Sequence, residues 1–116
     1  MPESMGCRQN DGSVYEYYDW PSFCKAFEIL RRAGLLRPPA RTKDDYTRGG
    51  VVLNILTALL SRRRRGQQCS ARDIFILWCR GNGADPASVF YELNEYLAGR
   101  GIRRTIVQYL EDVASI

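Results

Sequence analysis

The sequence contains no histidine, the side chain that most often acts as a general base or a metal ligand in proteins. Its four cysteines, at positions 7, 24, 69 and 79, include no CxxC pair, so their spacing does not predict a zinc site. A cysteine with no histidine to activate it is also a poor nucleophile. We therefore expect no catalytic residue, no metal site, no cofactor and no enzymatic activity.

Long hydrophobic runs are missing as well. The longest, from Val51 to Leu60, is interrupted by Asn54 and Thr57 and is far shorter than the roughly 20 residues that cross a bilayer. No signal peptide pattern precedes it. These features predict a soluble cytoplasmic protein with no membrane partner, whose cysteines are free thiols in a reducing compartment.

What the chain does have is an uneven distribution of charge. Residues 1–20 contain one basic and four acidic side chains, a net charge of −3, whereas residues 21–116 contain sixteen basic and nine acidic side chains, a net charge of +7. Hydrophobic residues make up 45% of the chain, which indicates a folded domain. The folded part is therefore basic and suited to an acidic protein surface or a phosphate backbone.

Apolar residues recur at helical spacing, and no segment alternates as a strand does. We predict an all-α fold, a single bundle of five to six helices over residues 15–116, after a disordered lead-in over residues 1–14. The first helix is expected from Ser22 to Ala33, with Asp19 or Ser22 as its N-cap and an apolar face that includes Phe23, Ala26, Phe27 and Leu30.

The second helix is expected from Tyr46 to Arg64, with Asp44 or Asp45 as its N-cap. Its apolar residues cover most of the circumference, which is typical of a central buried helix. Gly49 and Gly50 weaken its first turn, so an alternative start lies near Val51.

Three shorter helices follow, joined by two turns that contain glycine. The first begins after its N-cap Ser70, the second has Asp85 as N-cap and Pro86 in its first position, and the third is expected over residues 102–113. Trp78 is predicted to be a buried anchor of the core, facing apolar residues of the last two helices.

Arginines are the strongest candidates for a binding site. A run of four ends the second helix, and others lie on the later elements. Such side chains can contact phosphates, form a nuclear localisation signal or pair with acidic residues of a protein, whereas a solvated helix end is the equally weighted structural interpretation. The predicted partner-binding residues are Arg62, Arg63, Arg64, Arg65, Arg72, Arg80, Arg103 and Arg104.

Other patterns favour structural interpretations. The aromatic group of Tyr15, Tyr17, Tyr18 and Trp20 could stack on bases, but it lies in an acidic segment, and we expect it to fasten the chain entry to the core. The glycine-containing turns follow no strand and lack the spacing of a phosphate loop.

Residues 70–113 resemble the last three helices of the death-domain superfamily. The likeness is carried by a helix that ends in Trp, a Gly five residues later, leucines near the end of the next helix and an arginine before the last one. Upstream, Asp19-Trp20 and the residues after it are similar to the family's D-W-x-x-L-A-x-x-L helix. The matching residues of the last three helices are Ile74, Leu77, Trp78, Gly83, Val89, Leu93, Leu97, Arg103, Ile106, Val107 and Leu110.

The resemblance implies intracellular homotypic assembly in apoptotic or innate-immune signalling, through charged and apolar surface patches. The leading hypothesis is thus a non-enzymatic, death-domain-like adaptor, or a viral or host modulator of such adaptors. It would bind a protein with an acidic patch or form a homo-oligomer. The alternative is a small basic RNA- or DNA-binding protein, such as a viral one, that uses an Arg-rich surface and whose binding should weaken steeply with salt. A nuclear location would follow if the run from Arg62 to Arg65 is a localisation signal.

Overall fold

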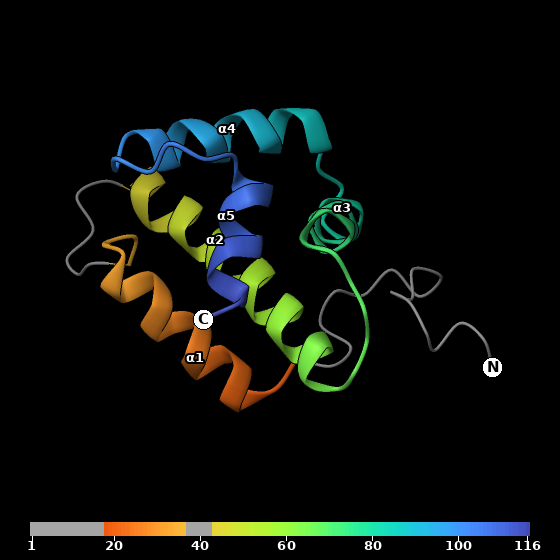
Figure 1. The fold of residues 1–116 in the computed structure, drawn as a ribbon. Coiled ribbons are helices and arrows are strands. Elements are labelled where there is room, and N and C mark those ends of the chain that lie inside the picture. The colour runs from red at the N-terminus through yellow and green to blue at the C-terminus, as the bar shows by residue number, and fades with distance from the viewer. Residues whose placement is uncertain (1–17, 37–42) are drawn as a thin grey trace.

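The computed structural model describes residues 18–36 and 43–116, with the side chains of residues 43–47 left out. These residues form five α-helices and, within those two ranges, no strand (Figure 1). The all-α prediction of a single bundle is confirmed. The expected lead-in, residues 1–14, lies outside the described residues. The helices are α1 (Trp20–Arg32), α2 (Lys43–Arg64), α3 (Ala71–Gly81), α4 (Pro86–Ala98) and α5 (Ile106–Ala114).

Helix α2 is the centre of the bundle and contacts each of the other four helices. In Figure 1 it runs diagonally between α1 on one side and α4 on the other. Its side chains at Val52, Ile55, Leu56 and Leu59 are fully buried. Because apolar residues occupy most of its circumference, it can be covered from several sides at once, as its sequence predicted.

Helices α3 and α4 begin at the N-caps that the sequence predicted, and α1 begins after Asp19, one of its two predicted N-caps, two residues before the expected start at Ser22. The side chains of Asp19, Ser70 and Asp85 accept hydrogen bonds from backbone amides three residues later, at 2.8, 3.1 and 3.1 Å. Pro21 and Pro86 lie in the first turns of α1 and α4. The local sequence thus determines where these helices start.

The start of α2 was predicted incorrectly. The helix begins at Lys43, so Asp44 and Asp45 lie inside its first turn, and Gly49 and Gly50 lie within the helix. A β-carbon at Gly49 would stand 2.8 Å from the Leu35 carbonyl oxygen and 2.9 Å from the Tyr96 hydroxyl. Gly49 therefore allows a close approach of the chain after α1 and of α4 rather than marking a helix end.

The start of α5 was also predicted incorrectly. It begins at Ile106, and Ile102 lies half-buried in the preceding turn. Thr105 and Gln108 form a reciprocal capping box, in which each side chain accepts from the other residue's backbone amide. Asn94 of α4 also accepts from the Ile106 amide, at 2.7 Å. The T-x-x-Q pattern in the sequence was the signal for this start.

The core contains most of the residues that the periodicity assigned to it, including Leu30, Leu77, Leu97 and Leu110. Trp78 packs against the core but is half-buried, so it is not the fully buried anchor that was expected. On α1, the side chains of Phe27 and Ala33 are exposed, although both were predicted to face inward. The face of α1 that is buried therefore contains fewer residues than the apolar spacing predicted.

Candidate interaction surfaces

The run of four arginines does not form one surface. Arg62 is 0% exposed and follows Ile55 and Leu59 on the inner face of α2. Its Nη1 lies 3.5 Å from Oε1 of Gln67. Arg62 was predicted to bind a partner, and its burial removes it from any exposed patch.

Arg63 joins three helices through one carboxylate. Its Nη2 donates to Oε1 of Glu111 on α5 at 2.7 Å, and its Nε donates to the Cys69 carbonyl at 3.1 Å. The other oxygen of Glu111 accepts from the backbone amide of Ala71, the first residue of α3, at 2.7 Å. The Glu111 carboxylate thus binds both the arginine at the end of α2 and the N-terminus of α3, which is the positive end of that helix dipole.

Replacing Glu111 by glutamine should change how stability depends on pH. Partial burial raises the pKa of Glu111, but the Ala71 amide and the Arg63 guanidinium outweigh it and hold the pKa below the ordinary value of a glutamate. A carboxylate with a depressed folded-state pKa contributes stability above its unfolded pKa, and this contribution is lost as the pH falls through the folded pKa. The wild type should therefore lose stability below about pH 4.5 more steeply than Glu111→Gln.

Thermal unfolding between pH 3 and 7 would measure this difference. Asp73→Asn is the control, because Asp73 lies in the first turn of α3 but makes no cross-helix ion pair with the described residues. Parallel pH profiles for the wild type and Glu111→Gln would contradict the assigned role.

The remaining arginines divide between two regions. Arg64 and Arg65 approach Oδ2 of Asp19 at 3.5 and 3.9 Å, beside the start of α1. Arg104 pairs with Asp112 of α5. Arg72, Arg80 and Arg103 are exposed on α3 and before α5. The predicted set is therefore not one positive patch, and several of its guanidiniums are already matched by carboxylates.

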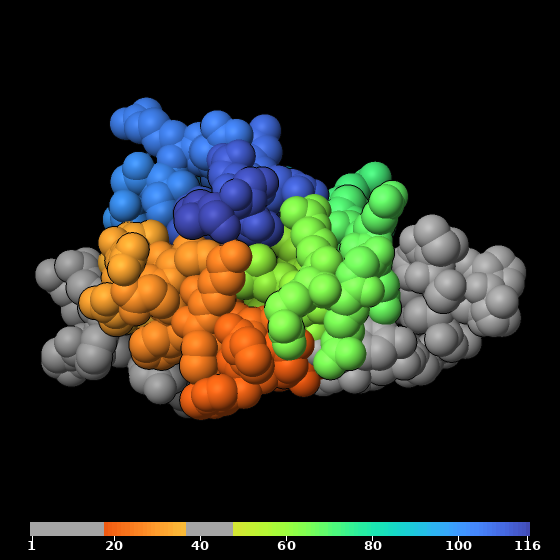
Figure 2. Space-filling view, turned by 60° about the horizontal axis from the view of Figure 1, so that its bottom comes forward, coloured from red at the N-terminus to blue at the C-terminus, as the bar shows by residue number. Residues whose placement is uncertain are grey.

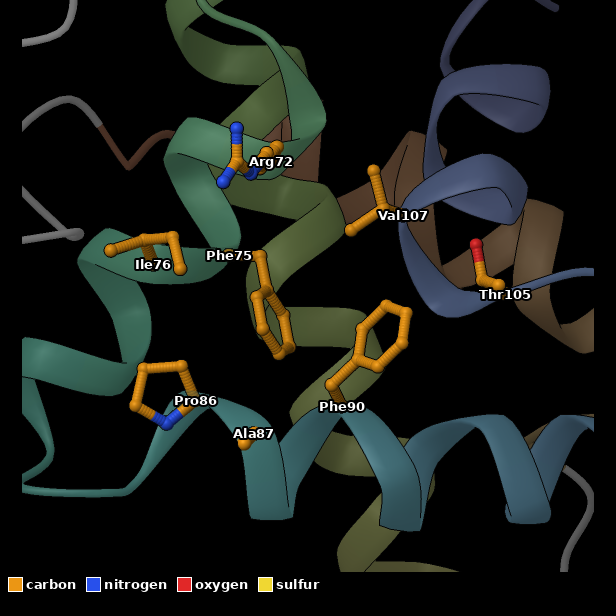
Figure 3. A pocket seen from close by; sticks show the side chains of 8 residues that line it. All are labelled: Arg72, Phe75, Ile76, Pro86, Ala87, Phe90, Thr105 and Val107. Carbon is orange, nitrogen blue, oxygen red and sulfur yellow. The ribbon is translucent and has the colours of Figure 1, made fainter.

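A groove lies where α3, α4 and the start of α5 meet (Figure 3). It has a volume of about 380 Å³. The buried Phe75 forms its floor and meets Phe90 of α4 edge to face, with ring centroids 6.2 Å apart. Arg72 stands at its rim, one turn before Phe75. The lining residues are Arg72, Phe75, Ile76, Pro86, Ala87, Phe90, Thr105 and Val107.

Arg72 is the charged residue among those that line this groove. Arg72 makes no ion pair with any residue in the described ranges, and Thr105 follows directly after Arg103 and Arg104 in the chain. The groove therefore combines an apolar floor with an exposed guanidinium. This combination was not predicted, because its walls come from three helices whose apolar residues were all assigned to the core.

A row of stacked aromatic rings, exposed at both ends, lies along α1. Trp20 stacks on Phe23 with centroids 5.3 Å apart, and Phe23 stacks on Phe27 at 6.2 Å. Trp20 is 72% exposed and Phe27 is 40% exposed. Among the aromatics expected to fasten the chain entry, Tyr18 does so, since its hydroxyl donates to Asn54 of α2. Trp20 does not, and Tyr15 and Tyr17 lie outside the described residues.

The cysteines differ from one another. Cys24 is an exposed free thiol and Cys79 a buried one, whose pKa is raised to about 11 by burial and by the nearby charge of Asp85. Cys69 is disulfide-bonded, so the prediction of four free thiols is wrong there. The fourth, Cys7, lies outside the described residues.

Within the described ranges no group of three His, Cys, Asp or Glu side chains is placed to hold a metal, and no helix could span a membrane.

Comparison with family models, with curated proteins and with solved structures yields no match to this chain. The resemblance to death domains therefore stays a prediction.

Proposed function

We propose that this chain is a non-enzymatic protein-interaction module, a death-domain-like adaptor or modulator. The observation that carries the proposal is the groove between α3, α4 and α5, where an apolar floor adjoins the exposed guanidinium of Arg72, which makes no ion pair with the described residues. The groove is a recess on a rigid bundle, which is the usual form of a peptide-binding site.

The lining of the groove specifies its ligand. Phe75, Phe90 and Val107 would contact a bulky apolar side chain, because only such a side chain gains by leaving water for these walls. Arg72 at the rim would pair with a carboxylate one helical turn away from that anchor. The partner is therefore an amphipathic segment with an apolar anchor flanked by Asp or Glu.

The arginine environments favour a protein partner over nucleic acid. Arg62 is buried, and Arg63 and Arg104 are engaged by Glu111 and Asp112. Phosphate binding draws on cations that release counterions from the nucleic acid, and Arg63 and Arg104 would first have to leave their carboxylates. The RNA- or DNA-binding alternative is accordingly the second outcome of the test below.

Selection from a randomised peptide display library would test the proposal. We expect the selected peptides to share a bulky apolar residue beside Asp or Glu. Arg72→Glu should weaken their binding at least about tenfold, the usual loss when an interfacial charge pair is reversed. Ala87→Trp, an exposed position on the groove wall, should block binding by filling the groove.

Lys25→Glu is the matched charge reversal on α1, away from the groove, and should bind as the wild type does. Binding of a labelled single-stranded RNA, measured at two salt concentrations, tests the nucleic-acid alternative. Selected peptides that ignore Arg72→Glu and Ala87→Trp would contradict the groove proposal. Strong salt-dependent RNA binding that the same variants leave unchanged would transfer the function to nucleic acid.

A further inference from the structure

We infer that a second copy of this chain covers the aromatic row on α1, and that two copies pair antiparallel through this helix. The row consists of Trp20, Phe23 and Phe27, stacked at centroid distances of 5.3 and 6.2 Å. It is separate from the groove, since α1 packs chiefly on α2, whereas α3, α4 and α5 line the groove (Figure 1). The inference therefore does not depend on the peptide-binding proposal.

The row is exposed at its two ends, whereas its middle ring, Phe23, is half-buried against the core. In Figure 2 the orange residues of α1 lie along the front of the molecule, and no later helix covers them. Trp20 is 72% and Phe27 is 40% exposed, and both belong to the few large apolar side chains that the described surface presents to water. Two exposed aromatic rings joined by stacking through a third are more typical of an interaction surface than of scattered surface residues.

The aromatic row is followed on the same side of α1 by an arginine, Arg31, that forms an ion pair with Glu28. Arg31 lies eleven residues after Trp20, which returns it to the same side of the helix. Its Nε and Nη2 donate to the two carboxylate oxygens of Glu28 at 3.1 and 2.7 Å. This two-point contact orients the exposed guanidinium, and the same carboxylate also accepts from Nε of Arg32 at 2.7 Å.

With Trp20 at one end and Arg31 at the other, this side of α1 is complementary to a second copy of itself. When two α1 helices lie antiparallel, Arg31 of each copy comes opposite Trp20 of the other, and the aromatic rings meet between them. A guanidinium over an exposed tryptophan ring gains a cation–π contact, and Trp is the best aromatic partner for it. A parallel arrangement would place arginine on arginine, so the stripe selects the antiparallel one.

Antiparallel pairing determines the assembly. Each copy uses the same patch, so the contact is isologous, closes as a dimer and cannot propagate. One helix pair buries less surface than a standard stable interface, so the dimer should be weak and should dissociate on dilution.

Light scattering over a dilution series tests the pairing. We expect the wild type to move from monomer to dimer as its concentration rises and to go no further. Trp20→Ala should weaken dimerisation at least about tenfold, because it removes both the exposed ring and the partner of Arg31 from each end of the contact. Tyr91→Ala removes an aromatic of similar exposure, 65%, from α4 and should dimerise as the wild type does. Thermal melts should show both variants folded.

Cross-linking at Cys24 gives an independent readout. This exposed free thiol lies on α1 between Phe23 and Phe27, close to the symmetry axis of the proposed pair. A short bis-maleimide should link two copies at concentrations where the dimer forms, and Cys24→Ser or Trp20→Ala should abolish the product. A monomer at every soluble concentration, a mass that grows beyond the dimer, or a dimer unaffected by Trp20→Ala would each overturn the inference.

Discussion

Replacing Gly49 by alanine should lower the free energy of unfolding by about 2 kcal/mol, although alanine is the better helix former. A β-carbon there would stand 2.8 Å from the carbonyl oxygen of Leu35 and 2.9 Å from the hydroxyl of Tyr96. These two atoms are hydrogen-bonded to each other at 2.9 Å in a buried position. The methyl group must separate them, which strains the packing and leaves a buried hydroxyl without its acceptor.

Gly50→Ala is the matched control, because no atom lies within 4 Å of a β-carbon at Gly50. There only helix propensity acts, and stability should rise by up to about 1 kcal/mol. Urea unfolding would measure both variants. In a Tyr96→Phe background the hydroxyl is absent, so Gly49→Ala should cost less than it does in the wild type. Equal effects of alanine at Gly49 and Gly50 would show that the close approach has no energetic role.

These glycines show where sequence reasoning stops. The N-caps at Asp19, Ser70 and Asp85 were predictable because a cap and the amide that it satisfies lie three residues apart. A pair of glycines near a helix start reads locally as a break. Its true role depends on Leu35 and Tyr96, which are brought together only by the packing of α1, α2 and α4.

For the candidate surfaces too, the local pattern was predictable from the sequence and the tertiary packing was not. The apolar residues that line the groove were recognised, but periodicity could not tell a residue packed in the core from one that faces a gap between three helices. On α1 the sequence did carry a signal, since Trp20, Phe23 and Phe27 are spaced for one side of a helix. Their exposure depends on how far α2 covers that side, which no local pattern reports.

The run of four arginines was the least well predicted feature, although part of its arrangement could have been predicted from helix geometry. Adjacent helical residues point in different directions, so four consecutive arginines at the end of a buried helix cannot all face solvent. The residue that continues the inner face after Ile55 and Leu59 is Arg62. Composition indicates a charged surface here, whereas helix phase indicates one buried arginine.

Arg62→Ala should therefore be strongly destabilising, by about 3 kcal/mol, because it removes a large, fully buried side chain and leaves a cavity beside the core of α2. Arg64→Ala is the matched control two residues later, where the side chain is 58% exposed and reaches Asp19 only at 3.5 Å. An exposed pair of this kind contributes little, so stability should change by less than about 0.5 kcal/mol.

Arg62→Met distinguishes the two contributions of the buried arginine. Methionine restores most of the volume of the side chain but none of its hydrogen-bond donors, including the one that faces Gln67. If packing dominates, Arg62→Met should recover most of the stability lost in Arg62→Ala. If the buried polar contacts dominate, the two variants should be similarly unstable. A normal denaturation midpoint for Arg62→Ala would contradict the burial itself and return Arg62 to the surface run.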